Sequence, residues 1–194
     1  GRLATSNSSF PILTIDKENR KIIVPNNDLF LELDFNSAEL RTLLSLTDKE
    51  QPEIDIHSWI KENIYSNKYE RKEVKEKVFK WLYNPSAKNK KLNSYFERDK
   101  IIEKYFDGDS ITNPFDRKIE VDKRKAVNYL IQSTTNDLVL RQALEIHDFL
   151  KESKSYIAFT IHDSIVIDIH RDDRSKIEKM AKMFKDMFKE MVSE

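Results

Sequence analysis

The sequence predicts an α+β protein in which helices pack on a small antiparallel sheet and a helical segment is inserted between its strands. Residues 156–168 place two runs of β-branched and aromatic residues around the polar tripeptide His162-Asp163-Ser164. This is the pattern of two antiparallel strands joined by a tight turn. Residues 29–34 alternate apolar and polar side chains, which predicts another strand. Helical patterns lie mainly between these strands, at residues 37–45, 68–83 and 122–150.

Length and composition limit the possible classes of protein. The 194 residues are enough for one domain with a hydrophobic core and an inserted subdomain. Lys plus Arg and Asp plus Glu number 34 each, and the zero net charge gives no support to a strongly basic nucleic-acid clamp, although a local groove stays possible. The chain has no cysteine, which excludes disulfides and cysteine-ligated metals and suits a reducing cytoplasm. No apolar run approaches the roughly 20 residues of a membrane span, so we expect no membrane partner.

Three further segments complete the expected elements. Residues 12–15 and 21–24 predict two short strands around a turn at residues 16–20. Residues 88–106 form a lysine-rich amphipathic segment. Residues 171–194 predict an amphipathic helix that covers the sheet from behind, and its apolar side carries Ile177, Met180, Met183, Phe184, Met187 and Met191.

Two aspartates are predicted at the ends of neighbouring strands. Asp34 ends the strand at residues 29–34, and Asp163 lies at the tip of the hairpin. Carboxylates in such positions could hold a pair of divalent cations, which lie about 3.5–4 Å apart in phosphoryl transfer and stabilise the attacking and leaving oxygens. An aspartate that ends a strand is more often the N-cap of the next helix, so the spacing alone leaves a structural role open for Asp34.

The predicted helix at residues 68–83 separates two kinds of side chain. Every fourth position carries a cation or an aromatic ring, in the order Arg71, Lys75, Phe79 and Tyr83. Val74, Val78 and Leu82 form a parallel apolar stripe that can pack on the body of the protein. This order suits a nucleoside triphosphate, because the phosphates need positive charge and the base and sugar need an aromatic surface a nucleotide's length away. The alternative is a solvated, charged helix.

The predicted helix at residues 122–150 carries a second polar row. Arg124, Asn128 and Gln132 fall at every fourth position. A solvated stripe is the alternative interpretation for any one of them taken alone. Asn84-Pro85 ends the earlier helix, and asparagine is a residue that can take the left-handed conformation usually supplied by glycine.

These stretches resemble the family A DNA polymerases, the bacterial DNA polymerase I type. Residues 34–41, Asp-Phe-Asn-Ser-Ala-Glu-Leu-Arg, resemble motif A, D-Y-S-Q-I-E-L-R, and residues 161–164, Ile-His-Asp-Ser, resemble motif C, V-H-D-E. The row on the helix at residues 68–83 matches motif B, R-x3-K-x3-F/Y-x3-Y-G, with Asn84 at the closing glycine. Residues 112–118 resemble the family's T-x-x-G-R-R, with Asp116 replacing the glycine. The motifs occur in family order over nearly the whole chain.

The resemblance implies a polymerase palm, an antiparallel sheet with packed helices, into which a helical fingers subdomain is inserted. The expected divisions are a first palm part with motif A at residues 1–54, fingers with motif B at residues 55–111, and a second palm part with the motif C hairpin and the C-terminal helix at residues 112–194. Because the chain opens on Gly1-Arg-Leu without a methionine, we expect a piece of a longer polymerase, with a thumb and possibly an exonuclease domain upstream.

The resemblance also implies template-directed addition of dNTPs to a primer 3′-hydroxyl with two Mg²⁺ ions, for which Mn²⁺ could substitute. Its implied metal ligands are the carboxylates of Asp34 and Asp163 and the backbone carbonyl of Phe35. Lys75 would assist the departure of pyrophosphate, and Arg71 would bind the γ-phosphate.

Further family positions imply contacts with nucleotide and DNA. Glu39 occupies the position of the steric gate, the side chain that excludes a ribose 2′-hydroxyl in this family. His57 occupies the position of the histidine that contacts the phosphates of the incoming nucleotide. The full nucleotide-binding set is then Glu39, His57, Arg71, Lys75, Phe79 and Tyr83. The positions implied to contact primer–template DNA are Arg2, Arg124, Asn128, Gln132 and His162. Such an enzyme would act in the cytoplasm, that of the host if a phage encodes it.

Two alternatives stay open. The sequence His-Asp-Ser also resembles the phage-type single-subunit RNA polymerases, which share the R-x3-K spacing but lack the gate glutamate and carry a methionine in place of Phe79. Glu39 and Phe79 therefore favour DNA synthesis. The second alternative is a non-catalytic fragment that binds nucleotide or DNA, because a chain of zero net charge lacks the excess of cations that usually gives DNA affinity.

Overall fold

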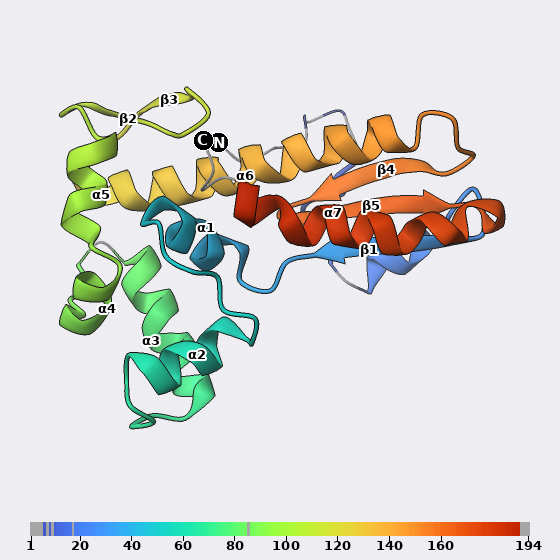
Figure 1. Cartoon of the computed structure of the whole chain (residues 1–194). Coiled ribbons are helices and arrows are strands. Elements are labelled where there is room, and N and C mark those ends of the chain that lie inside the picture. Colours follow the sequence, from blue (N-terminus) through green and yellow to red (C-terminus); the bar gives the residue numbers. More distant parts are fainter. Residues whose placement is uncertain (1–5, 7, 9, 17, 85, 191–194) are drawn as a thin grey trace. The chain divides into compact units, whose positions relative to one another are not determined.

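The computed structural model describes residues 6, 8, 10–16, 18–84 and 86–190 (Figure 1). Its elements in chain order are η1 (Asn19–Ile22), β1 (Leu29–Asp34), α1 (Ala38–Leu46), α2 (Ile56–Asn63), α3 (Arg71–Tyr83), α4 (Lys90–Tyr95), α5 (Arg98–Tyr105), β2 (Ser110–Thr112), β3 (Lys118–Glu120), α6 (Lys123–Phe149), β4 (Tyr156–Ile161), β5 (Ser164–Ile169), η2 (Arg171–Lys176) and α7 (Ile177–Glu190). The chain divides into two compact units, called here the sheet unit (residues 1–35 and 136–187) and the helical unit (residues 36–135 and 188–194).

The sheet unit is built on three antiparallel strands in the order β1-β5-β4 (Figure 1). All six residues of the central strand β5 are buried, as expected for a strand with a neighbour on each side and a predominantly apolar sequence. In β4 the pairing shifts between Ile157 and Phe159, so Ala158 is an extra residue in a β-bulge. The predicted strand and hairpin are confirmed, and with them the α+β class.

Helix α7 runs along the sheet (Figure 1). Met180, Phe184 and Met187 of this helix are buried, and the Phe184 ring lies 4.7 Å from the ring of Phe35. The helix begins later than predicted because residues 171–176 form the 3-10 helix η2. Met191 lies outside the described residues.

The prediction of short strands at residues 12–15 and 21–24 is wrong. The side chain of Asp16 accepts hydrogen bonds from the backbone N–H and the amide of Asn19, at 2.9 and 2.6 Å. The backbone N–H of Arg20 donates to the carbonyl of Asp16, and its side chain donates to the carbonyl of Ile15. These local bonds satisfy the backbone without a strand partner and curl the chain into η1.

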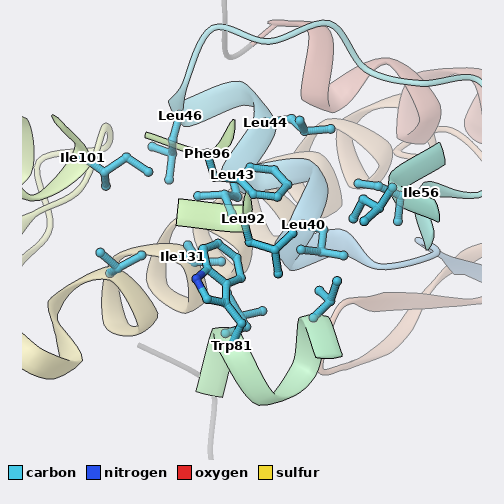
Figure 2. Close-up of a cluster of buried hydrophobic side chains, with 14 of the residues drawn as sticks. Leu40, Leu43, Leu44, Leu46, Ile56, Trp81, Leu92, Phe96, Ile101 and Ile131 are labelled. Atoms are coloured by element: carbon cyan, nitrogen blue, oxygen red, sulfur yellow. The ribbon is translucent and has the colours of Figure 1, made fainter. Parts of the chain in front are cut away.

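The helical unit encloses its own hydrophobic core (Figure 2). Trp81 of α3 stacks on Phe96, with ring centroids 5.4 Å apart, and its indole N–H donates to Asn93 at 2.6 Å. Helices α1, α2, α4, α5 and α6 add the labelled side chains Leu40, Leu43, Leu44, Leu46, Ile56, Leu92, Ile101 and Ile131. This core fixes α3 and thereby the row of polar and aromatic residues beside its buried stripe.

Three left-handed or extended residues shape the connections of the helical unit. Glu97, with φ of 47°, separates α4 from α5 within the predicted amphipathic segment. Asp116 has φ of 60° in the turn between β2 and β3, which is the left-handed region that favours glycine. Asn84 is extended rather than left-handed, with φ and ψ of −98° and 108°. Asn84 precedes Pro85 in the sequence, and a residue before proline is driven towards extended conformations.

Among the described residues, none of the helices combines the length and apolar character that crossing a membrane requires.

Candidate active site

Asp34 and Asp163 lie at the same end of the three-stranded sheet. Asp34 ends β1 and is paired in register with Ser164, the residue that directly follows Asp163 in the turn between β4 and β5. Partial burial and then the negative charge of Asp163 raise the pKa of the Asp34 carboxyl, helped by Glu32, while the backbone N–H of Phe35 opposes the rise. The N-cap of α1 is Ser37, so the structural alternative for Asp34 as a helix cap is excluded.

The turn that carries Asp163 is a two-residue hairpin, because Ile161 pairs directly with Ser164. His162 has φ of 54°, a positive value at the first turn residue that resembles a type II′ turn. Glycine is preferred at that position, so histidine there is strained, a feature often found near functional sites. The Ser164 hydroxyl donates to the carbonyl of Ile161 at 3.0 Å and closes the turn from within.

The base of this hairpin is fixed by two buried carboxylates that the sequence did not single out. Asp168 accepts the backbone N–H groups of Asn26 and Asn27 at 2.6 and 3.0 Å. Asp173 accepts the backbone N–H groups of Lys154 and Ser155 at 3.0 and 2.9 Å. Burial works against ionisation of Asp173, but the hydrogen bonds from Ser155 and the nearby Lys176 prevail and lower its pKa to about 2. No local sequence pattern indicates these bonds.

The part of the chain that the structure describes contains no group of three or more His, Asp or Glu side chains arranged to hold a metal ion. The two-aspartate pair Asp34 and Asp163 is the arrangement that remains for the predicted metal role, together with the carbonyl of Phe35. Two carboxylates and a carbonyl are the hard oxygen donors that Mg²⁺ prefers, and Mg²⁺ commonly takes one or two carboxylates and completes its shell with water and substrate oxygens.

Helix α3 presents its predicted row beside its buried stripe. Val74, Val78 and Leu82 are buried, whereas 43% of Phe79 and 37% of Tyr83 are exposed. The rings of Phe79 and Tyr83 stack at 5.6 Å, and the Lys75 ammonium lies 5.7 Å from the Phe79 centroid. These three predicted site residues therefore lie together. The alternative of a helix solvated all round is wrong, because the stripe of Val74, Val78 and Leu82 is buried.

Two of the remaining predicted nucleotide residues join this row from α1 and α2. The Tyr83 hydroxyl donates a hydrogen bond to the Glu39 carboxylate. The His57 ring lies 6.2 Å from the Phe79 ring and is almost completely buried. Its Nε2 is 3.2 Å from the Ser37 hydroxyl, and its buried Nδ1 has no hydrogen-bond partner among the residues that the structure describes. Burial lowers the pKa of His57, which keeps the ring neutral at physiological pH.

Arg71, at the start of the row, forms a two-pronged ion pair. Its Nε and Nη2 donate to the two carboxylate oxygens of Asp55 at 2.9 and 2.8 Å. This hydrogen bonding lowers the pKa of Asp55 well below its ordinary value and raises the pKa of Arg71. The sequence did not indicate this pairing, because the two residues are 16 positions apart on different helices.

The predicted DNA contacts are only partly described. On α6, the Gln132 amide donates to Asn128 at 2.9 Å, which confirms that these two residues share a face. Arg124 is exposed and pairs with Asp122 at 3.0 Å. His162 is exposed at the hairpin turn. Arg2 lies outside the described residues.

Comparisons with known proteins find similarity to DNA polymerases in sequence and in fold. The chain is 32% identical over 108 residues to a DNA polymerase of Bacillus phage SP01, a match that covers 55% of this chain and 11% of the phage polymerase. Its fold is similar to that of the POL domain of Pol1 from M. smegmatis, solved in complex with DNA primer-template and dNTP, with a TM-score of 0.74 and 16% identity. The predicted resemblance to the family A DNA polymerases is confirmed.

These matches have a defined extent. The structural match covers 96% of this chain and 43% of the mycobacterial chain, so this chain spans less than half of either relative. At 16% identity the structural likeness shows the fold. No protein-family model matches the chain.

Proposed function

We propose that this chain is the part of a template-directed DNA polymerase that joins a dNTP to a primer 3′-hydroxyl. The observation that carries the proposal is the exposed row of α3, where cations and stacked aromatic rings follow one another at four-residue intervals. The likeness to a phage DNA polymerase and to a polymerase domain supports the same activity. On this proposal the palm and fingers divide as expected from the sequence, at residues 1–54, 55–111 and 112–194, and the thumb belongs to another part of a longer protein.

Asp34, Asp163 and the carbonyl of Phe35 would hold two Mg²⁺ ions, for which Mn²⁺ could substitute. The raised pKa of Asp34 supports this role, because a carboxylate beside a like charge gains most from a bound cation. When bound, such ions lower the pKa of the primer hydroxyl and neutralise charge on the triphosphate. The carboxylates themselves are held at one end of a sheet, which keeps them from rearranging as the substrate enters.

The α3 row would bind the nucleotide along its length. Arg71 takes the γ-phosphate, and Lys75 neutralises the pyrophosphate as the bond between the α-phosphorus and its bridging oxygen breaks. The rings of Phe79 and Tyr83 offer an aromatic surface to base and sugar. His57, kept neutral by burial, would act towards phosphate as a hydrogen-bond donor rather than as a charge. Catalysis by these groups is positioning and charge compensation, as expected for phosphoryl transfer.

Discrimination against ribonucleotides would fall to Glu39. The hydrogen bond from the Tyr83 hydroxyl fixes the Glu39 carboxylate, and a fixed side chain can exclude a 2′-hydroxyl that a mobile one would accommodate. This contact favours DNA synthesis over the RNA polymerase alternative. Incorporation of ribonucleotides against deoxyribonucleotides tests the choice, and a strong preference for ribonucleotides would reverse it.

The primer–template would contact Arg2, Arg124, Asn128, Gln132 and His162. Polar side chains that meet the minor groove test the shape of a base pair with little sequence information, which suits a copying enzyme. A titration of primer–template binding across salt concentration separates the polymerase from a non-catalytic nucleotide-binding fragment. Tight, salt-sensitive binding supports the polymerase, since it reports phosphate neutralisation.

The decisive experiment is primer extension on a DNA template with Mg²⁺ and dNTPs. We expect Asp163→Ala to abolish extension and Asp172→Ala to leave it unchanged, because Asp172 is an exposed aspartate paired with Lys154. Extension by Asp163→Ala at the wild-type rate would contradict the proposed role of the two-aspartate pair. A preparation that is folded by circular dichroism and binds neither dNTP nor DNA would contradict the proposed function as a whole.

A further inference from the structure

Asp55 holds Arg71 by a contact that the proposed function does not require. The carboxylate accepts two parallel hydrogen bonds, from Nε at 2.9 Å and from Nη2 at 2.8 Å. Such a fork fixes both the position and the plane of a guanidinium, whereas a single contact leaves it free to rotate. About half of the Arg71 side chain is exposed, so the group is held in place without being removed from solvent.

The Asp55 carboxylate is itself fixed independently of Arg71. Asp55 is the N-cap of α2, and its Oδ2 accepts the backbone N–H of Ser58 at 2.9 Å and the Ser58 hydroxyl at 3.0 Å. Its Oδ1 accepts the side-chain amide of Asn36 at 3.3 Å. The orientation of the guanidinium is therefore set by the first turn of α2, a rigid point in the helical unit.

The fork leaves part of the guanidinium outside the pair. Arginine has five N–H groups, and the pair uses one from Nε and one from Nη2. One N–H of Nη1 and the second N–H of Nη2 point in parallel from the far edge of the plane. That edge has the spacing that binds two phosphate oxygens.

We propose that Asp55 is a positioning residue for Arg71, which presents the outer edge of its guanidinium to the terminal phosphates of a nucleoside triphosphate. Asp55 stays paired with Arg71 while the nucleotide is bound. The inference rests on the proposed function, since it concerns the same nucleotide. The opposite arrangement, in which Asp55 and the triphosphate compete for Arg71, gives the opposite sign in the experiment below.

Asp55→Asn separates positioning from folding. Asparagine is as good an N-cap as aspartate, so α2 keeps its first turn, while the charge-assisted fork to Arg71 is lost. We measure the dissociation constants of dATP and dAMP with Mg²⁺ and without DNA, by isothermal titration calorimetry, so that no turnover occurs. We expect dATP to bind about tenfold more weakly and dAMP to bind as before, because only the triphosphate reaches Arg71.

Three control variants complete the design. Asp122→Asn breaks a comparable aspartate–arginine pair, that of Asp122 with Arg124, and is expected to leave dATP binding unchanged. Arg71→Ala is expected to weaken dATP binding, and Asp55→Asn in that background should add nothing further. Thermal unfolding checks that each variant is folded.

The outcomes distinguish this inference from the proposed function. If Arg71→Ala weakens dATP binding but Asp55→Asn leaves it unchanged or tightens it, Asp55 does not position Arg71 and the inference is overturned, while the proposed function stands. If the wild-type chain binds no dATP, or Arg71→Ala binds it as well as the wild type, the proposed phosphate site itself fails. Weakening of dATP binding by both single variants, without a further loss in the double variant, establishes the positioning role.

Discussion

Replacing Asp34 with asparagine should stabilise the metal-free protein while it removes the proposed activity. The Asp34 carboxylate is partly desolvated and stands beside the charge of Asp163, and both effects raise its pKa. Asparagine removes the charge but keeps an oxygen that can accept the N–H of Phe35. Since Asp34 is an exposed residue, solvent screens the repulsion, and we expect a gain of only about 0.5 kcal/mol in the free energy of unfolding at neutral pH.

The sign of the pH dependence follows from the direction of the shift. A carboxyl whose folded pKa is raised binds more protons in the folded state than in the unfolded state above the unfolded value of 3.8. The folded wild type therefore loses stability as the pH rises from 3.8 through the raised pKa. The stability difference that comes from this charge should therefore vanish near pH 3. At pH 7 the free energy of unfolding of Asp34→Asn should be higher than that of the wild type.

Thermal unfolding with EDTA and with Mg²⁺ measures both effects. At pH 7 in EDTA the gain corresponds to a melting temperature about 1–2 °C higher for Asp34→Asn. Mg²⁺ should raise the melting temperature of the wild type and not that of the variant. Glu32→Gln is the matched control, because Glu32 also raises the pKa of Asp34 but is not a proposed ligand. A destabilised Asp34→Asn, or one that Mg²⁺ stabilises as much as the wild type, would refute the reasoning.

Three further predictions follow from contacts in the helical unit. Tyr83→Phe removes the hydrogen bond to Glu39 and should reduce discrimination against ribonucleotides about fivefold, measured as the ratio of dNTP to rNTP incorporation. The pKa of His57 is lowered in the folded protein, so below the unfolded value of 6.5 the unfolded chain binds a proton that the folded chain does not. The free energy of unfolding should therefore fall as the pH drops through that value. His57→Gln should flatten this pH dependence, measured by urea denaturation between pH 7.5 and 5.5. Trp81→Ala deletes a buried ring stacked on Phe96 and should cost about 3–5 kcal/mol in the same assay, and a loss below 1 kcal/mol would contradict its place in the core.

The parts of the fold that the sequence predicts correctly have a strong periodic pattern. Alternation identified β1, the run of β-branched residues identified the hairpin of β4 and β5, and the four-residue spacing identified both faces of α3. These patterns succeed because each depends on burial that repeats along one element. The helix at residues 122–150 was predicted within one residue of α6 at each end.

Features that depend on contacts distant in sequence were missed. Asp168 binds backbone N–H groups more than 140 positions away, and nothing in the residues around it distinguishes it from a solvated aspartate. The pair of Asp55 and Arg71 was missed for the same reason. The catalytic and binding roles of the site residues stay predictions.

The bulge in β4 has a consequence for how the length of this chain can vary. Ala158 has no opposite residue in β5, since Ile157 pairs with Ile167 and Phe159 pairs with Val166. Deleting Ala158 would leave every other pair of the hairpin in place, whereas a deletion outside the bulge would move the following side chains to the other face. Related sequences that differ by one residue here can therefore keep the same turn, and alignments should allow their gap at this position rather than next to Asp163.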